Sequence, residues 1–269
     1  MVKLKVAHTP DADDAFMFYA MTHDEIDTWL EIEHVIEDIE SLNRKAFEVE
    51  YDVTAISAYA YSFLSDRYQI LSSGASVGDG YGPIVVAMEE IDLRHREIAV
   101  PGRYTTANLL LNLAIDFKPV EMRFDEIIPA VKEGRVDAGL LIHEGQITYK
   151  DHNLVRVLDL WEWWHDKAKL PLPLGLNAIK RDLDAEVKKE FLRVMRESIN
   201  YALKNVDIAM DYAMKYSRGL DKETATKFAL MYVNRYTYEM PESVKKALEL
   251  LYKMGEKKGL LKMPPLDIL

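Results

Sequence analysis

The sequence predicts an α/β protein of two similar lobes with a central cleft between them. Segments with strand-like patterns are repeatedly followed by segments with helical periodicity. The order of short helix, aspartate and apolar strand occurs twice, ending in DVTAIS at 52–57 and VDAGLLI at 136–142. Strands alternating with helices favour mostly parallel sheets, whose ligand sites lie at the carboxyl ends of the strands. A chain of 269 residues is long enough for two compact lobes.

Composition and charge exclude several classes of protein. Hydrophobic residues make up 49% of the chain and charged residues 29%, as in ordinary globular proteins. The formal net charge of −11 argues against nucleic-acid binding in general, because phosphate contacts need clustered Lys and Arg. There is no cysteine, which rules out disulfides, thiolate metal sites and cysteine nucleophiles.

The chain shows no pattern typical of membrane insertion or export. Its first residues, MVKLKVAHTPDADDAF, become polar and acidic where a signal peptide would be apolar. No run of about 18 apolar residues follows, as a membrane-spanning helix would need. We therefore expect a cytoplasmic protein that has a small-molecule ligand and no membrane partner.

The first third of the chain is expected to contribute alternating strands and helices. Strands are predicted at 2–8, 30–36 and 52–57, and helices at 15–22, from 41 to about 48, and at 58–64. Asp11 or Asp13 is expected to cap the first of these helices, because a carboxylate there can accept hydrogen bonds from free backbone N–H groups.

The middle of the chain is expected to form a second lobe, so that the chain crosses between the two lobes twice. Strands are predicted at 97–100 and 136–142, and helices at 108–117 and 125–133. Pro171 and Pro173 enforce an extended segment that can return the chain to the first lobe, and residues 185–258 then supply covering helices. We assign residues 1–86 and 178–269 to the first lobe and 87–177 to the second.

Polar residues stand at four junctions where a strand ends or a helix begins. These are Asp11–Asp14, Ser57, Thr105–Ala107 and His143 with Glu144. In an open α/β architecture all four can face one crevice. Thr105 and Thr106 can cap a helix, and the N–H groups at that helix end favour a carboxylate or another anion. Ser57 can likewise cap the next helix or bind a ligand.

His143 is the candidate general base, because imidazole accepts a proton near neutral pH. The alternative is a structural role, which is the usual role of a lone histidine. His143 and Glu144 begin like a zinc-protease motif, but Ile147 stands where the second histidine would be. Zinc hydrolysis is therefore not expected.

The acidic residues Asp11, Asp13 and Asp14 can in principle bind a hard cation such as Mg²⁺ or Ca²⁺. Their spacing lacks the rest of a calcium-binding loop, and helix capping accounts for one or two of the side chains. We therefore predict no metal site.

Two further features favour structural roles. The glycine-rich stretch Ser72–Pro83 leads into the β-branched run IVV and not into a helix, so we expect a turn or an interlobe hinge instead of a phosphate loop. Trp161, Trp163 and Trp164 can wall an aromatic ligand, but packing in the core or between the lobes is the expected role.

Six blocks of sequence occur in a specific order between about residues 6 and 180. They are PDADDAFMFYA, DVTAIS, SSGASVGDGYGP, PGRYTTANLLL, DEIIPAVKEGRVDAGLLIHEGQITY and DLWEWWHDKAKLPLPLG. Together they resemble the 1,4-dihydroxy-6-naphthoate synthases of the futalosine route to menaquinone. The C-terminal helices are less diagnostic, and the pattern G-x-VDAGL alone occurs across binding-protein folds.

The resemblance implies the fold of the type II periplasmic binding proteins, a reaction without a known cofactor, and a carboxylated small-molecule substrate. The implied reaction is a carbon–carbon lyase reaction that converts cyclic dehypoxanthinylfutalosine to 1,4-dihydroxy-6-naphthoate. His143 stands at the family's proposed base position. The family's substrate contacts fall on Ala55, Ile56, Ser57, Thr106 and Ala107, and Asp14 and Thr105 are further expected cleft residues.

One segment departs from the family pattern. Many members have a Pro-Asn-Asp-Thr-type sequence in the first loop, where this chain has Asp11-Ala12-Asp13-Asp14-Ala15, so a carboxylated substrate would meet extra negative charge and fewer polar partners. Two alternative functions stay open at this point. One is a non-catalytic solute-binding protein for a small anionic metabolite, and the other is the related chorismate dehydratase. The HEGQITY and PLPLG segments favour the synthase.

Overall fold

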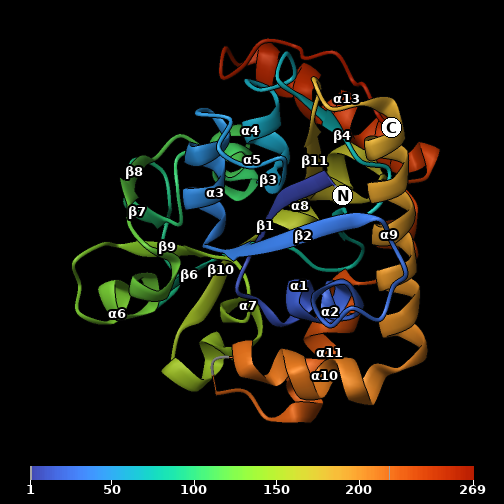
Figure 1. Cartoon of the computed structure of the whole chain (residues 1–269). Helices are drawn as coiled ribbons and strands as arrows, with labels where there is room; N and C mark the ends of the chain where they lie inside the picture. The colour runs from blue at the N-terminus through green and yellow to red at the C-terminus, as the bar shows by residue number, and fades with distance from the viewer. Residues whose placement is uncertain (1, 218) are drawn as a thin grey trace.

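Two mixed β-sheets with helices packed around them make up residues 2–217 and 219–269, the part of the chain that the computed structural model describes (Figure 1). The first sheet has the order β2 (Leu30–Ile36), β1 (Val2–His8), β3 (Val53–Ser57), β11 (Leu172–Lys180) and β4 (Tyr68–Ile70), and β5 (Ser76–Gly78) also pairs with β11. The second has the order β10 (Val155–Asp159), β6 (Ile84–Ala87), β9 (Ala138–Leu141), β7 (Glu97–Val100) and β8 (Lys118–Glu121). This architecture confirms the predicted α/β class.

Each sheet has a parallel centre to which antiparallel strands are added. β1 is parallel to β2 and β3, and β7 is parallel to β8 and β9. β11 is antiparallel to β3, β4 and β5, and β6 is antiparallel to β9 and β10. The expectation of mostly parallel sheets is therefore wrong. β6 is the first strand after the chain crosses to the second sheet, and β11 is the first strand after it returns. Each is antiparallel to the strands with which it pairs.

The chain passes to the second sheet between β5 and β6 and returns between β10 and β11. The predicted lobe boundaries, 86/87 and 177/178, fall inside β6 and β11. In the structure the chain therefore crosses between the sheets a few residues before each predicted boundary. Pro173 lies within β11, in the extended segment expected there. The glycine-rich stretch contains β5 and the first passage. The assignment of the surrounding helices to lobes stays a prediction.

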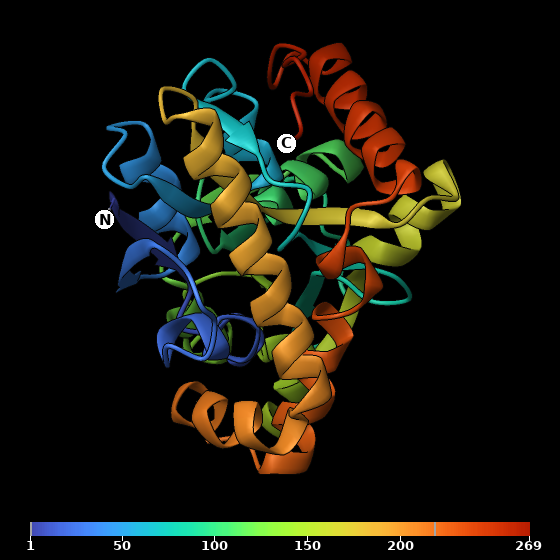
Figure 2. The same ribbon diagram turned by 45° about the vertical axis from the view of Figure 1, so that its right-hand side comes forward.

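Helices surround both sheets. Beside the first lie α1 (Ala12–Met17), α2 (Tyr19–Thr22), α3 (Ile39–Ala46), α4 (Ala58–Tyr61), α9 (Ala185–Lys204), α10 (Val206–Ala213), α11 (Lys222–Tyr232), α12 (Arg235–Tyr238) and α13 (Glu242–Lys257). Beside the second lies α6 (Ile127–Lys132), and α7 (Gly145–Thr148) follows its strand β9. α5 (Thr106–Ala114) contacts β11 of the first sheet, and α8 (Leu160–Ala168) contacts both β11 and β6. Short 3₁₀ helices occupy 124–126, 149–152 and 214–216. Figure 2 shows α9 running along much of the molecule.

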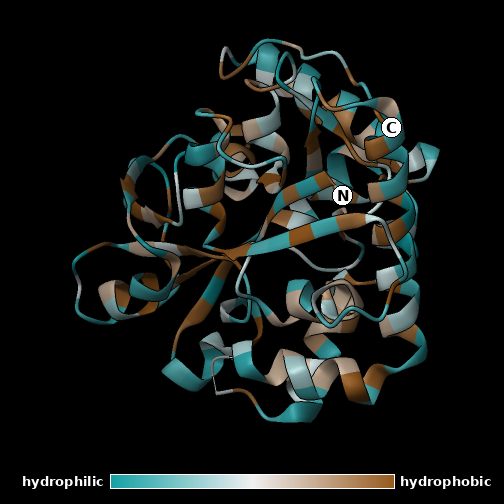
Figure 3. Ribbon diagram, viewed as in Figure 1, coloured by the Kyte–Doolittle hydropathy of each residue, from teal (hydrophilic) through white to brown (hydrophobic). Residues whose placement is uncertain are grey.

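The strands form the apolar interior. Every residue of β3, β6 and β9 is buried, as expected for strands that are covered on both faces. Figure 3 shows hydrophobic and polar residues alternating along β2, and both kinds of residue on the outer helices. One apolar cluster contains Ile56 and Val77 of the first sheet together with Val85 and Ile98 of the second. This shared core joins the sheets and fixes the segments around the space between them.

Several element boundaries differ from the predictions. The first helix begins at Ala12, not at residue 15, so Asp13 lies inside it and cannot be its cap. α3 begins at Ile39, because the carboxylate of Asp38 accepts hydrogen bonds from the first backbone N–H groups. β9 ends at Leu141, which places His143 in the turn after the strand. Strand β10 and helix α8 were not predicted from the sequence.

Candidate active site

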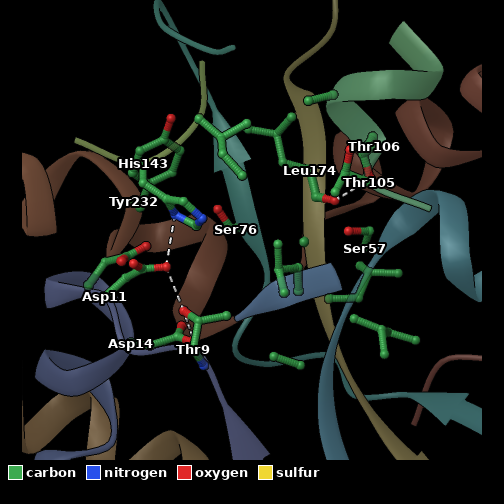
Figure 4. A pocket seen from close by; sticks show the side chains of 18 of the residues that line it. Thr9, Asp11, Asp14, Ser57, Ser76, Thr105, Thr106, His143, Leu174 and Tyr232 are labelled. Carbon is green, nitrogen blue, oxygen red and sulfur yellow. Dashed lines mark hydrogen bonds and ion pairs between the residues drawn. The ribbon is translucent and has the colours of Figure 1, made fainter. Parts of the chain in front are cut away.

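A cavity lies between the two sheets (Figure 4). It contains about 740 Å³ of space free of protein atoms, part of which opens to solvent. All eight residues predicted for the cleft line it, namely Asp14, Ala55, Ile56, Ser57, Thr105, Thr106, Ala107 and His143. A cavity of this size suits a small metabolite. The ends of the strands and the starts of the helices thus meet where the sequence predicted.

Ser57 stands on one wall, at the end of β3. Its backbone N–H donates to Oδ1 of Asn43 at 2.9 Å, and its hydroxyl oxygen accepts from Nδ2 of Asn43 at 3.1 Å. Although Ser57 occupies the N-cap position of α4, its side chain makes no capping hydrogen bond. The capping interpretation of Ser57 is therefore wrong. Asn43 holds the hydroxyl in place and leaves its hydrogen available for a ligand.

The N-terminus of α5 faces the same side of the cavity (Figure 4). Thr105 is the predicted cap, since its hydroxyl accepts from the backbone N–H of Asn108 at 3.2 Å. Thr106 does not cap the helix. Its hydroxyl donates to the carbonyl oxygen of Leu174 at 2.6 Å and accepts from the N–H of Tyr59 at 3.2 Å. These bonds fix the first turn of α5, whose free N–H groups favour an anion.

The opposite wall holds an aspartate and histidine pair. Nδ1 of His143 lies 2.8 Å from Oδ2 of Asp11, and the same carboxylate oxygen accepts from the hydroxyl of Thr9 at 2.8 Å. Phe124 packs edge-on against the imidazole, with ring centroids 5.0 Å apart. Asp11 is at the N-cap position of α1 but makes no capping hydrogen bond, so the predicted capping role is wrong. The carboxylate is directed to His143 instead.

Asp13 and Asp14 complete the acidic side of the cavity. Oδ2 of Asp14 accepts from the backbone N–H of Thr9 at 2.7 Å, and the Thr9 hydroxyl, at 2.8 Å from Oδ2 of both Asp14 and Asp11, shares its one hydrogen between them. Burial raises the pKa of Asp14 to about 6, although these hydrogen bonds oppose the rise. Burial, then the charges of Asp14 and Asp11, raises the pKa of Asp13 well above its usual range. Within residues 2–217 and 219–269, no group of three or more His, Asp or Glu side chains is arranged to hold a metal ion.

Several cavity residues were missed by the sequence predictions. The hydroxyl of Tyr232 on α11 lies 2.9 Å from the side-chain amide of Gln146 on α7. Asn177 on β11 donates through Nδ2 to the carbonyl oxygen of Gly74 at 2.8 Å, while its buried Oδ1 has no hydrogen-bond partner in the described part of the chain. These side chains belong to ordinary strand and helix patterns, so the sequence carries no local signal that distinguishes them.

The tryptophans have the packing role that was expected. Trp164 is fully buried, and its indole N–H donates to the carbonyl oxygen of Leu170 at 3.0 Å. Trp161 and Trp163 pack against the core that the two sheets share. None of the three is among the residues that line the cavity.

Comparison with known proteins assigns the chain to a family. A model of the family described as "Menaquinone biosynthesis" matches residues 4–257. The chain belongs to this menaquinone biosynthesis family. The match spans both sheets and every residue of the cavity described above, so family membership concerns the site as well as the fold.

Two relatives of this menaquinone biosynthesis protein have the same name. The 1,4-dihydroxy-6-naphthoate synthase of Thermus thermophilus is 39% identical over 267 residues, which is 98% of each chain. That of Streptomyces coelicolor is 33% identical over 266 residues, covering 96% of this chain and 94% of its own. Membership of the family and these full-length synthase relatives identify an enzyme of menaquinone biosynthesis.

Solved structures agree on the fold. A protein from Archaeoglobus fulgidus matches with a TM-score of 0.95 and 72% identity, over 96% of this chain and 98% of its own. The alkanesulfonate-binding protein SsuA of Xanthomonas axonopodis pv. citri matches with a TM-score of 0.78 at 12% identity, over 100% and 98% of the two chains. The second likeness shows the periplasmic-binding-protein fold alone. Among the helices described, none is long and apolar enough to span a bilayer.

Proposed function

We propose that this protein is a 1,4-dihydroxy-6-naphthoate synthase, a carbon–carbon lyase that acts on cyclic dehypoxanthinylfutalosine. The relatives with that name, which span nearly the whole chain, support the proposal. The observation that carries it is the division of the cavity. One wall presents an imidazole, and the facing wall presents a serine hydroxyl and the N-terminus of α5.

In the proposed reaction, His143 acts as the general base. The neutral imidazole takes a proton from a substrate hydroxyl, and the oxygen electron pair forms a carbonyl group as the adjacent carbon–carbon bond breaks. The electrons of that bond enter the ring system, whose aromatisation to naphthalene drives completion. The step moves a proton and breaks a bond without an external electron acceptor, so the proposal names no cofactor.

The facing wall is proposed to hold the substrate carboxylate. The hydroxyl of Ser57 and the first N–H groups of α5, at Thr106 and Ala107, are donors that suit an anion. Ala55 and Ile56 would contribute apolar surface beside the ring. With the carboxylate fixed on this wall, the rest of the substrate would reach across the cavity towards His143.

Product formation by purified protein tests the proposal. Wild type should convert cyclic dehypoxanthinylfutalosine to dihydroxynaphthoate, detected by mass spectrometry. His143→Ala should lower kcat by about a hundredfold or more, as expected when a general base is removed. His152→Ala is the matched control, because His152 lies in the same lobe but not on the cavity, and it should keep wild-type turnover.

The alternatives give different results in the same assay. A wild-type protein that binds the compound tightly without turnover would support a solute-binding protein instead. Product from chorismate alone, supplied in a parallel reaction, would point to the dehydratase. Full turnover by His143→Ala would remove the base assignment and leave the activity standing.

A further inference from the structure

We infer that Asp11 is a positioning residue for His143. The inference rests on the proposed function in one respect, the role of His143 as base. Nothing in the sequence pattern gave Asp11 this role, because its place before a helix predicts capping. The structure instead places its carboxylate against an imidazole that follows 132 positions later in the chain.

The contacts of Asp11 support a positioning role. Only 3% of its side chain is exposed, and only 15% of the side chain of His143. A buried carboxylate is costly unless it is hydrogen-bonded, and Asp11 gains the hydroxyl of Thr9 and Nδ1 of His143 on one oxygen. The same residue forgoes the capping bonds that its backbone position offers. The carboxylate is therefore oriented towards the imidazole by the fold around it.

The pairing fixes the tautomer of the imidazole. A carboxylate accepts hydrogen bonds, so Nδ1 of His143 carries the hydrogen in the neutral ring and Nε2 is the basic nitrogen. The contact also fixes the plane of the ring, together with the edge of Phe124. A base acting through Nε2 needs both conditions, because a ring with the other tautomer would offer a hydrogen where the substrate proton must be accepted.

The pair also joins the two halves of the molecule. Asp11 follows β1 of the first sheet, and His143 follows β9 of the second. His143 has a positive φ of 54°, a conformation that bulky residues adopt at some cost in energy. The turn after β9 thus directs the ring towards Asp11 in the loop that follows β1.

Other ionisable groups surround the pair, and a test must separate their charges from the contact itself. Asp13 and Asp14 lie on α1, Glu144 lies beside α7 and Tyr232 lies on α11. Asp13 is the best control. It lines the same cavity, carries the same functional group and follows Asp11 by two residues.

The kinetic test compares Asp11→Ala with Asp13→Ala. Asp11→Ala should lower kcat by about a hundredfold or more and change KM by less than about threefold, because the lost interaction orients the base and does not hold the substrate. Formate is a carboxylate small enough for the vacated space. Adding it should raise the kcat of Asp11→Ala at least tenfold. It should have no such effect on Asp13→Ala. Wild-type kcat in Asp11→Ala, or equal effects of formate on both variants, would overturn the inference.

A measurement without substrate keeps the two proposals distinguishable. In protein labelled with ¹⁵N-histidine, long-range ¹H–¹⁵N spectra report which ring nitrogen carries the hydrogen, and His143→Gln identifies the signal of His143 among the seven histidines. The neutral ring should be protonated at Nδ1 in wild type and Asp13→Ala, and should lose that preference in Asp11→Ala. An unchanged tautomer in Asp11→Ala would contradict the inference even in an active enzyme. An inactive wild type with the expected tautomers would defeat only the proposed function.

Discussion

At the scale of single residues, burial disfavours the charged form of two carboxyl groups in the acidic loop after β1. Burial raises the pKa of both Asp13 and Asp14. Asp11 is satisfied differently, through Thr9 and His143. The extra acidic residue of this loop thus has a pKa shifted in the direction that lowers its repulsion towards a carboxylated substrate.

The raised pKa of Asp14 leads to a prediction about stability. An acid whose pKa is higher in the folded state binds protons more readily when folded, so stability falls as the pH rises between the two pKa values. For Asp14 this window runs from 3.8 to about 6. Asp14→Asn keeps an oxygen for Thr9 but buries no charge. Relative to wild type, the variant should gain up to about 3 kcal/mol of unfolding free energy between pH 4 and pH 7.

Urea unfolding at pH 4, 5.5 and 7 measures this difference. Asp66→Asn, at an exposed aspartate, controls for the loss of one negative charge and should follow the wild-type pH dependence. Parallel curves for wild type and Asp14→Asn would show that burial of the Asp14 carboxylate carries no such cost.

Local sequence patterns predicted correctly which residues line the cavity. They were less successful in predicting the hydrogen bonds that each of these residues makes. Thr105 caps α5 as its position suggests, because the acceptor and the donor are three residues apart. Asp11 and Ser57 occupy equivalent positions, yet their side chains bond to groups brought near by the fold. Asn43 precedes Ser57 by 14 residues, and His143 follows a strand of the other sheet. Such partners cannot be inferred from neighbours in the sequence.

At the scale of elements, α3 of the first sheet is fixed to the segment before α5. Oε2 of Glu40 accepts from the backbone N–H of Tyr104 at 3.0 Å. Gly102 lies against the same side chain, and a Cβ atom there would be 2.4 Å from that carboxylate oxygen. The absence of a side chain at residue 102 thus allows Glu40 to reach the segment. This contact sets the position of the anion-favouring end of α5.

Gly102→Ala should disturb that position. The added methyl group must displace Glu40 and strain a backbone with φ of 154°, at a cost of about 1–3 kcal/mol in stability. Displacement of the first turn of α5 should also raise KM by about tenfold, since small errors in positioning have large effects. Gly134 also has a positive φ, but no atom lies within 4 Å of the methyl group that Gly134→Ala would add. This variant should therefore lose stability with no change in KM.

Steady-state kinetics and thermal unfolding of the two variants separate these effects. An unchanged KM in Gly102→Ala, with stability lost as in Gly134→Ala, would show that the Glu40 contact does not position α5.

The elements themselves were predictable to different degrees. β1, β3 and β9 have apolar runs followed by turn or helix signals, so the sequence located the strand ends that form the cavity. The three residues of β5 and the passages around it have no such pattern. Their strand conformation depends on pairing with β11, which lies about a hundred residues later. β5 and its antiparallel pairing with β11 were missed for this reason.

At the scale of the whole molecule, bonds on several sides hold the two halves together. Arg44 on α3 pairs with Glu121 on β8, and Thr106 on α5 donates to Leu174 on β11. Asp11 and His143, and Tyr232 and Gln146, make the corresponding contacts on the other side of the cavity. The candidate chemistry thus lies at the boundary between the two halves.

Tyr232→Phe tests whether these contacts govern closure. The change removes one hydroxyl and its bond to Gln146 but leaves the buried ring in place. A hydrogen bond contributes about 0.5–1.5 kcal/mol, so weaker closure should raise KM by about two- to tenfold. Because bound substrate still contacts both walls, kcat should stay within about twofold. Tyr236→Phe is the matched control, since its hydroxyl donates to Asp79 at 2.9 Å away from the cavity and its loss should leave KM unchanged. Equal KM values in the two variants would show that the Tyr232 bond contributes nothing to closure, and would leave Asp11 and His143 as the contact that couples the two halves on that side.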